Sequence, residues 1–184
     1  MRFIFRIVQK EIIVLLGGPG TGKSTLINEL VARGYCCYPE ISREVTLEAQ
    51  KRGIEQLFLE QPLLFSEMLL EGRIQQFKSA VQEPDNVVFI DRGIPDVVAY
   101  MDYIGDEYPE YFIDACENYK YSKTFILPPW EEIYKSDTER YENFEQALEI
   151  QKHLIETYKK YGYDLIEVPK DTVENRILFI LDKI

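Results

Sequence analysis

A glycine-rich segment followed by a lysine and a serine lies near the N-terminus of the chain. Residues 17–24 read G-G-P-G-T-G-K-S and match the P-loop pattern G-x-x-x-x-G-K-S/T, after an apolar run and before a helical segment. Glycines let a loop curl so that several backbone N–H groups converge on one phosphate, and the first helical turn adds its own unpaired N–H groups. The segment therefore predicts a site for a nucleoside triphosphate, with ATP and Mg²⁺ as the expected ligands.

The side chains of this loop suit particular parts of the nucleotide. Lys23 can reach the β- and γ-phosphates, and Ser24 can give its hydroxyl oxygen to Mg²⁺. Thr25 is expected to donate to the α-phosphate. The remaining nucleotide-binding residues of the loop are Gly18, Pro19, Gly20, Thr21 and Gly22. An incidental glycine turn is the alternative, but the flanking strand and helix argue against it.

A carboxylate ends another apolar run. Asp91 closes the run 87–91, where P-loop proteins place the acidic residue that holds Mg²⁺ or its water, so Ser24 and Asp91 are the expected metal ligands. Arg92 follows directly and could pair with Asp91 or contact an anionic substrate. An aspartate at the end of a strand is also often only a turn or cap residue, and both readings stay open.

A second carboxylate, Glu40, follows the short run 35–38, and Arg43 stands three residues later. In kinases of this architecture the corresponding loop faces the phosphoryl acceptor. Glu40 could there bind an acceptor hydroxyl or accept its proton, with Arg43 and Arg92 as further substrate-binding residues. A helix-starting glutamate with an arginine partner on a wet surface fits the spacing equally well.

A charged segment, residues 128–142, follows the fourth apolar run. In small-molecule kinases a lid with arginines closes at this place over the phosphates, which excludes water and stabilises the transferring charge. Arg140 is the first candidate for that charge and Lys135 the second, whereas a solvated acidic loop is the alternative. Trp130, at the start of the segment, is either a core anchor or a stacking surface.

The turn 169–172 precedes the last helical segment. Lys170 in this turn could border the adenine ring, and Asp171 or Thr172 could cap the helix; the two readings are compatible. The only histidine, His153, lies in the middle of a helical segment, so we interpret it as structural.

Apolar runs of strand length alternate with helix-length periodic segments. The expected strands are 12–16, 35–38, 87–91, 124–127 and 164–168, and the expected helices are 22–33, 43–52, 61–81, 95–103, 109–119, 143–161 and 173–181. This alternation predicts an α/β protein of three layers, with a parallel sheet of about five strands and helices on both faces. Since ligands bind beyond the carboxyl ends of such strands, the candidate residues should surround one cleft.

Composition narrows the classes of function further. The 184 residues suit a single domain, 1–184, and the net charge of −11 makes nucleic acid a poor partner. No apolar run reaches the length of a membrane helix, so membrane insertion is not expected. Three cysteines, with Cys36 and Cys37 adjacent in an apolar run that reads as a buried strand, form neither a disulfide framework nor a metal-binding spacing. A cytoplasmic location is the simplest reading, and the N-terminal residues 1–9 read as a strand extension or ragged start.

Four segments together resemble one known family. Residues 17–25, Glu40 with Arg43, residues 89–92 and residues 127–140 recur in this order in the AAA-like P-loop family that includes the ribosylnicotinamide kinase domain of NadR. The resemblance covers nearly the whole chain and implies a stand-alone kinase-like unit, too short for a ring-forming AAA+ module. In one respect the chain departs from the riboside kinases, which carry an Asp-Thr-Asp-like segment at residues 91–93. The sequence here, Asp-Arg-Gly, is more similar to the acid–arginine pair of deoxynucleoside kinases, which leaves the riboside substrate open.

The favoured function is a small-molecule, nucleoside-like kinase that transfers the γ-phosphoryl group of ATP·Mg²⁺ to a hydroxyl. Lys23, Asp91, Glu40 and Arg140 are its expected catalytic residues. The alternative is a nucleotide-dependent switch or slow hydrolase that acts on a protein or lipid partner. A third possibility is a protein that has lost activity and keeps a nucleotide for structure. ATP is preferred to GTP because the guanine-reading segment Asn-Lys-x-Asp does not occur. The oligomeric state does not follow from the sequence.

Overall fold

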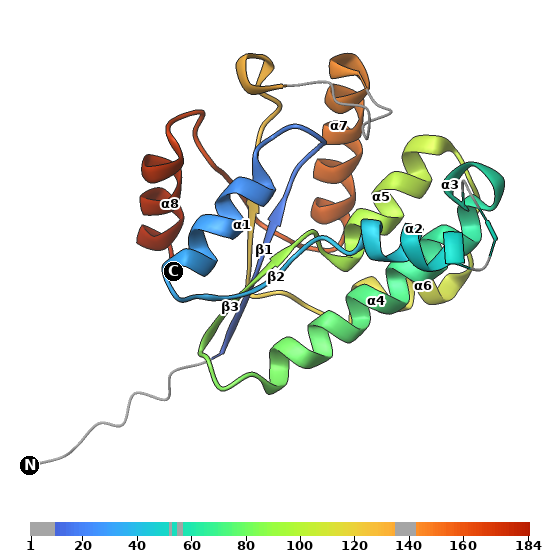
Figure 1. Ribbon diagram of the computed structural model, residues 1–184, viewed down its shortest axis with the longest axis horizontal. Helices are drawn as coiled ribbons and strands as arrows, with labels where there is room; N and C mark the ends of the chain where they lie inside the picture. Colours follow the sequence, from blue (N-terminus) through green and yellow to red (C-terminus); the bar gives the residue numbers. More distant parts are fainter. Residues whose placement is uncertain (1–9, 52, 55–56, 135–142) are drawn as a thin grey trace, which may run out of the picture.

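The computed structural model describes residues 10–51, 53–54, 57–134 and 143–184. Its centre is a sheet of five parallel strands in the order β2-β3-β1-β4-β5 (Figure 1). The strands are β1 (Glu11–Leu16), β2 (Cys36–Tyr38), β3 (Val87–Asp91), β4 (Lys123–Ile126) and β5 (Leu165–Glu167). The α/β class and the five-stranded parallel sheet expected from the sequence are confirmed.

Helices connect the strands. The helices are α1 (Lys23–Ala32), α2 (Ser42–Lys51), α3 (Leu57–Glu60), α4 (Pro62–Gln82), α5 (Ile94–Ile104), α6 (Glu110–Asn118), α7 (Phe144–Lys160) and α8 (Val173–Asp182), with a 3₁₀ turn, η1 (Glu131–Ile133). The short α3 and the turn η1 were not expected, because four- and three-residue elements carry no periodic apolar pattern of their own.

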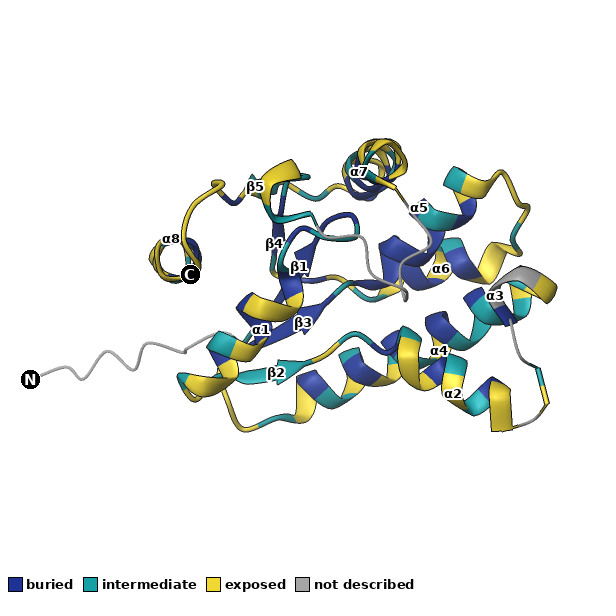
Figure 2. Cartoon of the chain, turned by 45° about the horizontal axis from the view of Figure 1, so that its top comes forward, coloured by how far each residue is buried: buried dark blue, intermediate teal, exposed yellow. Residues whose placement is uncertain are grey.

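The central strand shows why helices cover both faces of the sheet. All of residues 12–16 are buried, and successive side chains of a strand point to opposite faces. Ile13 and Leu15 pack with residues of α1 and α8, whereas Val14 and Leu16 pack with residues of α2, α4, α5, α6 and α7. Figure 2 shows the result, with the buried faces of these helices turned toward the sheet. A continuous apolar run is therefore what the position of β1 requires.

The outer strands are less buried. Cys36 and Cys37 lie in β2 at the edge of the sheet and are only half-buried, so the buried strand expected for them is wrong. Burial is still sufficient to raise the pKa of the Cys37 thiol to about 12, which keeps it a neutral, small apolar side chain. No helix in the described part of the chain combines the length and the apolar character that a membrane span requires.

The strand register brings the candidate residues to one edge of the sheet. Leu15 of β1 is aligned with Asp91 of β3, and Leu16 is aligned with Ile126 of β4. The backbone N–H groups of Arg92 and Leu127 donate to the carbonyls of Leu15 and Leu16, at 3.0 and 2.8 Å. The segments that follow β1, β3 and β4 therefore leave the sheet side by side.

Candidate functional site

The loop after β1 has positive φ angles at three glycines, Gly17, Gly20 and Gly22. Gly17 has a φ of 147°, and a Cβ atom there would stand 2.6 Å from the carbonyl oxygen of Leu127. Gly22 has a φ of 87° at the start of α1. Because larger residues rarely adopt these angles, the glycine spacing of the sequence is explained by the shape of the loop. No side chain caps α1, and its first turn holds no acidic residue, which suits an anion at this helix end.

Lys23 is folded against this loop. Its Nζ donates to the carbonyls of Gly17 and Gly18, each at 2.8 Å, and to Oγ1 of Thr21 at 3.3 Å. Burial lowers the pKa of Lys23 to about 7, and the positive charge of Arg92 acts in the same direction. A phosphate oxygen carries a negative charge and is therefore a stronger acceptor for an ammonium group than the neutral carbonyls that Lys23 contacts here. A bound anion would therefore favour the protonated, positively charged form of Lys23.

A pH dependence of nucleotide affinity follows from this pKa. Above pH 7 a growing fraction of the free protein holds neutral Lys23, so ATP·Mg²⁺ affinity should fall by about tenfold per pH unit between pH 8 and 9. The effect on stability has the opposite sign: because the folded pKa lies below the ordinary value of 10.5, burial of charged Lys23 destabilises the free protein at low pH, and this cost is relieved as the pH rises from 7 to 10.5. Calorimetric titrations at several pH values test this, with Lys23→Ala as the control that should lose the dependence.

Helix α7 holds the beginning of the loop. The side-chain oxygen of Gln151 accepts from the N–H of Gly18 at 3.2 Å, and its Nε2 donates to the carbonyl of Leu127 at 3.4 Å. Gln151 is buried, and 133 residues separate it from Gly18. This contact was not foreseen from the sequence, since a single glutamine in an amphipathic helix carries no motif.

Asp91 ends β3 as expected and is 3% exposed. Its Oδ1 has no hydrogen-bond partner among the described residues. Burial raises the pKa of Asp91, while Lys23 and Arg92 act against that rise. Buried polar atoms normally have partners, so an orphaned carboxylate oxygen beside the P-loop fits a cation or a cation-bound water. Ser24, the other residue expected at Mg²⁺, is exposed in the first turn of α1.

Glu40 lies between two arginines. Its Oε1 accepts from the backbone N–H groups of Ile41 and Ser42, at 3.0 and 3.2 Å, and thus begins α2. It also pairs with Arg73 at 3.3 Å, and its Oε2 forms a short ion pair with Arg92. Burial alone would raise the pKa of Glu40, but the two arginines and the backbone donors outweigh burial and lower it. Glu40 is therefore a charged carboxylate near neutral pH.

Arg92 has an unusual backbone. Its φ of 70° makes it the one residue other than glycine with positive φ in the described part of the chain. The guanidinium pairs with Glu40 and, at 3.4 Å, with Asp96, and it lies 5.3 Å from the ring centre of Tyr100. Backbone strain of this kind often marks a functional site. From the sequence Arg92 could pair with Asp91 or contact an anionic substrate; its ion pairs in the structure run to Glu40 and Asp96.

Two charged residues of this network, Arg73 and Asp96, were missed from the sequence. Arg73 of α4 is 4% exposed and donates to the carbonyl of Gly93 at 3.1 Å. Asp96 of α5 is fully buried and accepts from the N–H of Gly93 at 2.9 Å and from the hydroxyl of Tyr158 at 2.6 Å. The available signal was a charged residue among the apolar positions of a helix, which requires a partner in the core.

The other expected residues take different positions. Arg43 is exposed in the first turn of α2, and Lys170 is exposed in the turn before α8. Thr172 caps α8 by accepting from the N–H of Asn175 at 3.2 Å, so Thr172 is the cap of the two expected from the sequence. Arg140 and Lys135 lie outside the described residues. His153 packs against the ring of Tyr103, with ring centres 5.8 Å apart.

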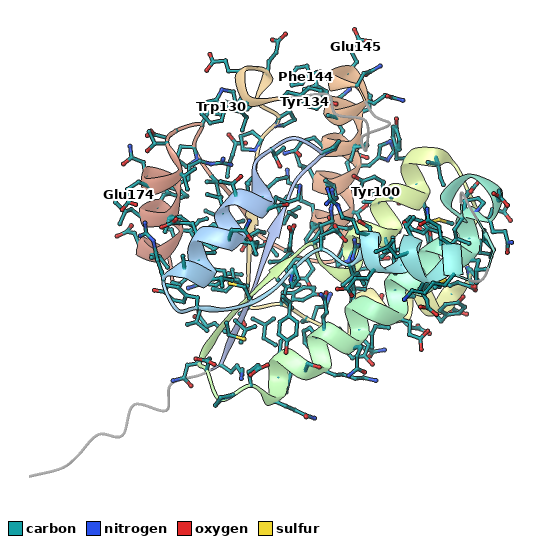
Figure 3. All side chains as sticks on the ribbon, viewed as in Figure 1. Tyr100, Trp130, Tyr134, Phe144, Glu145 and Glu174 are labelled. Atoms are coloured by element: carbon teal, nitrogen blue, oxygen red, sulfur yellow. The ribbon has the colours of Figure 1, made fainter. Side chains whose placement is uncertain are left out.

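Aromatic residues from the start of the expected lid stand over the loop. A Cβ atom on Gly20 would lie 2.5 Å from the ring of Tyr134, and this ring packs edge-on against Phe144 with centres 5.5 Å apart. Trp130 lies 5.9 Å from the guanidinium of Arg176 and thus offers a stacking surface. Figure 3 shows Trp130, Tyr134 and Phe144 at the same end of the molecule. Aromatic side chains here border the P-loop.

The parallel sheet, the loop after its central strand and the buried ionic network beside that loop define a P-loop protein with a kinase-like fold. A family model described as an AAA domain matches residues 12–176. The chain therefore belongs to this AAA-domain family, of the NadR type, and the resemblance stated from the sequence is confirmed. No curated protein matches the sequence.

Several solved structures share the fold. Deoxyadenosine kinase from M. mycoides, with dCMP and a flexible dCDP bound, is 20% identical with a TM-score of 0.69, over 94% of this chain and 97% of that one. The NadR protein in complex with NR is 18% identical with a TM-score of 0.74, over 94% of this chain and 50% of NadR. Thymidylate kinase from Candida albicans is 17% identical with a TM-score of 0.67, over 95% and 91%. At these identities the likeness is one of fold.

Proposed function

We propose that the protein is an ATP-dependent kinase that transfers the γ-phosphoryl group of ATP·Mg²⁺ to a hydroxyl of a neutral, nucleoside-like molecule. One observation carries the proposal. The backbone N–H of Arg92 donates to the carbonyl of Leu15, in the strand that leads into the phosphate loop, at 3.0 Å, and the Arg92 guanidinium forms an ion pair with Glu40. The phosphate loop and the glutamate between two arginines are thus held next to each other, as donor and acceptor sites of a kinase must be.

The residues support a transfer governed by positioning and charge. Lys23 and the loop amides would hold the phosphates, while Glu40 would accept a hydrogen bond from the attacking hydroxyl. That hydroxyl oxygen forms the new P–O bond, the bond from the γ-phosphorus to the bridging oxygen breaks, ADP leaves, and the hydroxyl proton passes to Glu40. Because the transition state is loose, little proton transfer precedes bond cleavage, and a weakly basic carboxylate suffices.

The charge balance of the network favours a neutral acceptor. Arg73 and Arg92 are both paired with carboxylates, Glu40 and Asp96. An acceptor that already carries a phosphate would have to compete with these carboxylates for the arginines. A nucleoside, the kind of acceptor that a deoxyadenosine kinase takes, needs only hydrogen bonds. A nucleoside monophosphate, the acceptor of a thymidylate kinase, fits the paired network less well.

The acceptor test measures ADP release with nucleosides, nucleoside monophosphates and small polyols as acceptors. At least one nucleoside should raise ADP release well above the rate without acceptor, and mass spectrometry should find it phosphorylated. Preference for nucleoside monophosphates would contradict the neutral acceptor. Turnover that no acceptor changes would contradict the kinase and favour the switch or slow hydrolase.

A magnesium dependence follows from Asp91. Bound Mg²⁺ would supply charge neutralisation at the phosphates, with Ser24 and Asp91 as the oxygen ligands that fit it. Asp91→Asn removes the negative charge, so the Mg²⁺ concentration for half-maximal activity should rise by about 10- to 100-fold. Because Oδ1 has no partner among the described residues, the free protein should melt at the same temperature or higher.

Magnesium titrations at fixed ATP, with melting curves of both proteins, check this prediction. The exposed Asp102→Asn, on the neighbouring helix α5, is a control expected to change neither quantity. An Asp91→Asn protein with an unchanged Mg²⁺ requirement would show that Asp91 is a turn residue only.

A further inference from the structure

A buried arginine of the last helix touches the phosphate loop from a site that no motif marks. Arg176 lies in the first turn of α8, which Thr172 caps, and it is 3% exposed. Its guanidinium donates to the carbonyl oxygen of Thr21 at 3.0 Å, across 155 residues of sequence. The apolar residues Ile177 and Ile180 pack in the core cluster that α8 shares with α1. The helix therefore fixes Arg176 against the loop.

The charge of Arg176 has no carboxylate partner among the described ion pairs, which is unusual for a buried arginine. Its Nε is buried and has no hydrogen-bond partner within the described residues, and burial lowers its pKa. The surroundings offer the carbonyl dipole of Thr21 and the face of Trp130, whose ring centre is 5.9 Å away. A buried cation without a counter-charge, next to a loop built for anions, has its natural counter-charge in a bound phosphate.

The contact also determines how one loop amide points. A trans peptide is planar, so its C=O and N–H bonds point in opposite directions. Because the carbonyl of Thr21 is directed to Arg176, the N–H of Gly22 in the same peptide is directed away from α8. Gly22 also makes room for the arginine, since a Cβ atom there would stand 2.9 Å from Nη1 of Arg176. Gly22, the second fixed glycine of the P-loop pattern, thus allows both the positive φ of the loop and the close approach of Arg176.

We propose that Arg176 is a positioning residue of the triphosphate site: it orients the Thr21–Gly22 peptide so that the Gly22 N–H faces the phosphates, and its uncompensated charge strengthens their binding. Arg176 acts through the loop and through its field and does not touch the acceptor. This inference rests on the nucleotide-binding part of the function proposed above and is independent of the acceptor.

The test compares two neutral variants, Arg176→Met and Arg176→Gln, with Arg176→Lys. Losing a charged hydrogen bond should weaken ATP·Mg²⁺ binding in calorimetry by about 10- to 100-fold in each neutral variant. Lysine keeps the charge and should stay within about threefold of the wild type. The KM for ATP should rise in the neutral variants while the KM for the acceptor stays the same. Methionine replaces a buried, unpaired charge, so its melting temperature without nucleotide should not fall.

Ile177→Val is the matched control, because Ile177 is the fully buried neighbour on α8. It should lower the melting temperature and leave the ATP·Mg²⁺ affinity unchanged. The proposal is overturned if either neutral variant folds and binds ATP·Mg²⁺ as tightly as the wild type. A wild type that binds ATP·Mg²⁺ but phosphorylates no acceptor contradicts the kinase function alone and leaves the role of Arg176 standing.

Discussion

Replacing Lys23 with alanine should abolish measurable phosphoryl transfer and weaken ATP·Mg²⁺ binding by about 100- to 1000-fold. The expected size is that of removing one preorganised donor from a buried site where charge develops. Lys23 is 7% exposed and its Nζ already donates to the carbonyls of Gly17 and Gly18, so the variant loses a buried cation that lies against the loop. Calorimetry with ATP·Mg²⁺ and single-turnover assays measure the two effects.

Lys123→Ala is the control for this variant. Lys123 lies at the other end of the sheet, at the start of β4, and pairs with Glu11 at 3.3 Å. Its removal should leave binding and transfer unchanged. A Lys23→Ala protein with unaltered affinity and stability would instead favour a protein that holds nucleotide for structure, without using the lysine.

Replacing Glu40 with glutamine should lower acceptor-dependent turnover by about 100- to 1000-fold while the KM for ATP changes little. The amide keeps the shape of the side chain but cannot take the hydroxyl proton. It also removes the negative charge that pairs with Arg73 and Arg92, so the free energy of unfolding should fall by up to about 3 kcal/mol. The turnover is measured with the acceptor identified among the nucleosides and other compounds tested above. The free energy of unfolding is measured by denaturant titration.

A purely structural Glu40 would give a different pattern. Transfer to the acceptor and hydrolysis without acceptor would then decline together, in proportion to the unfolded fraction. If Glu40 accepts the hydroxyl proton, transfer to the acceptor declines far more than hydrolysis. Glu44→Gln, an exposed change in the first turn of α2, should affect neither rate.

Local patterns of the sequence predicted the fold and the phosphate loop. The buried run 12–16 and the glycines that follow it require only neighbours in sequence to be understood, and the structure places them as expected. Asp91 followed from the same logic, because the end of a buried strand lies at the sheet edge in any parallel α/β protein.

The ionic network could not be derived in the same way. Arg73 lies on α4, 33 residues from Glu40, and the packing of α4 against α2 and α5 brings it into the network. Asp96 pairs with Arg92 four residues before it, but the sequence alone did not show that both side chains are buried beside Glu40. Sequence spacing pointed to Arg43, three residues from Glu40, which is exposed on α2. Gln151 and Arg176 illustrate the same limit, since their partners in the loop stand 133 and 155 residues away.

We infer that the backbone of residues 17–24, with Lys23, forms a nest for the phosphates of a nucleotide. Titration of ATP with Mg²⁺ into the folded wild-type chain in a calorimeter tests it most directly. We expect saturable heat with one nucleotide bound per chain, and weaker binding at pH 9 than at pH 7 because Lys23 loses its proton. A folded protein that gives no heat with ATP or with any other nucleoside triphosphate would show that these residues form no such nest.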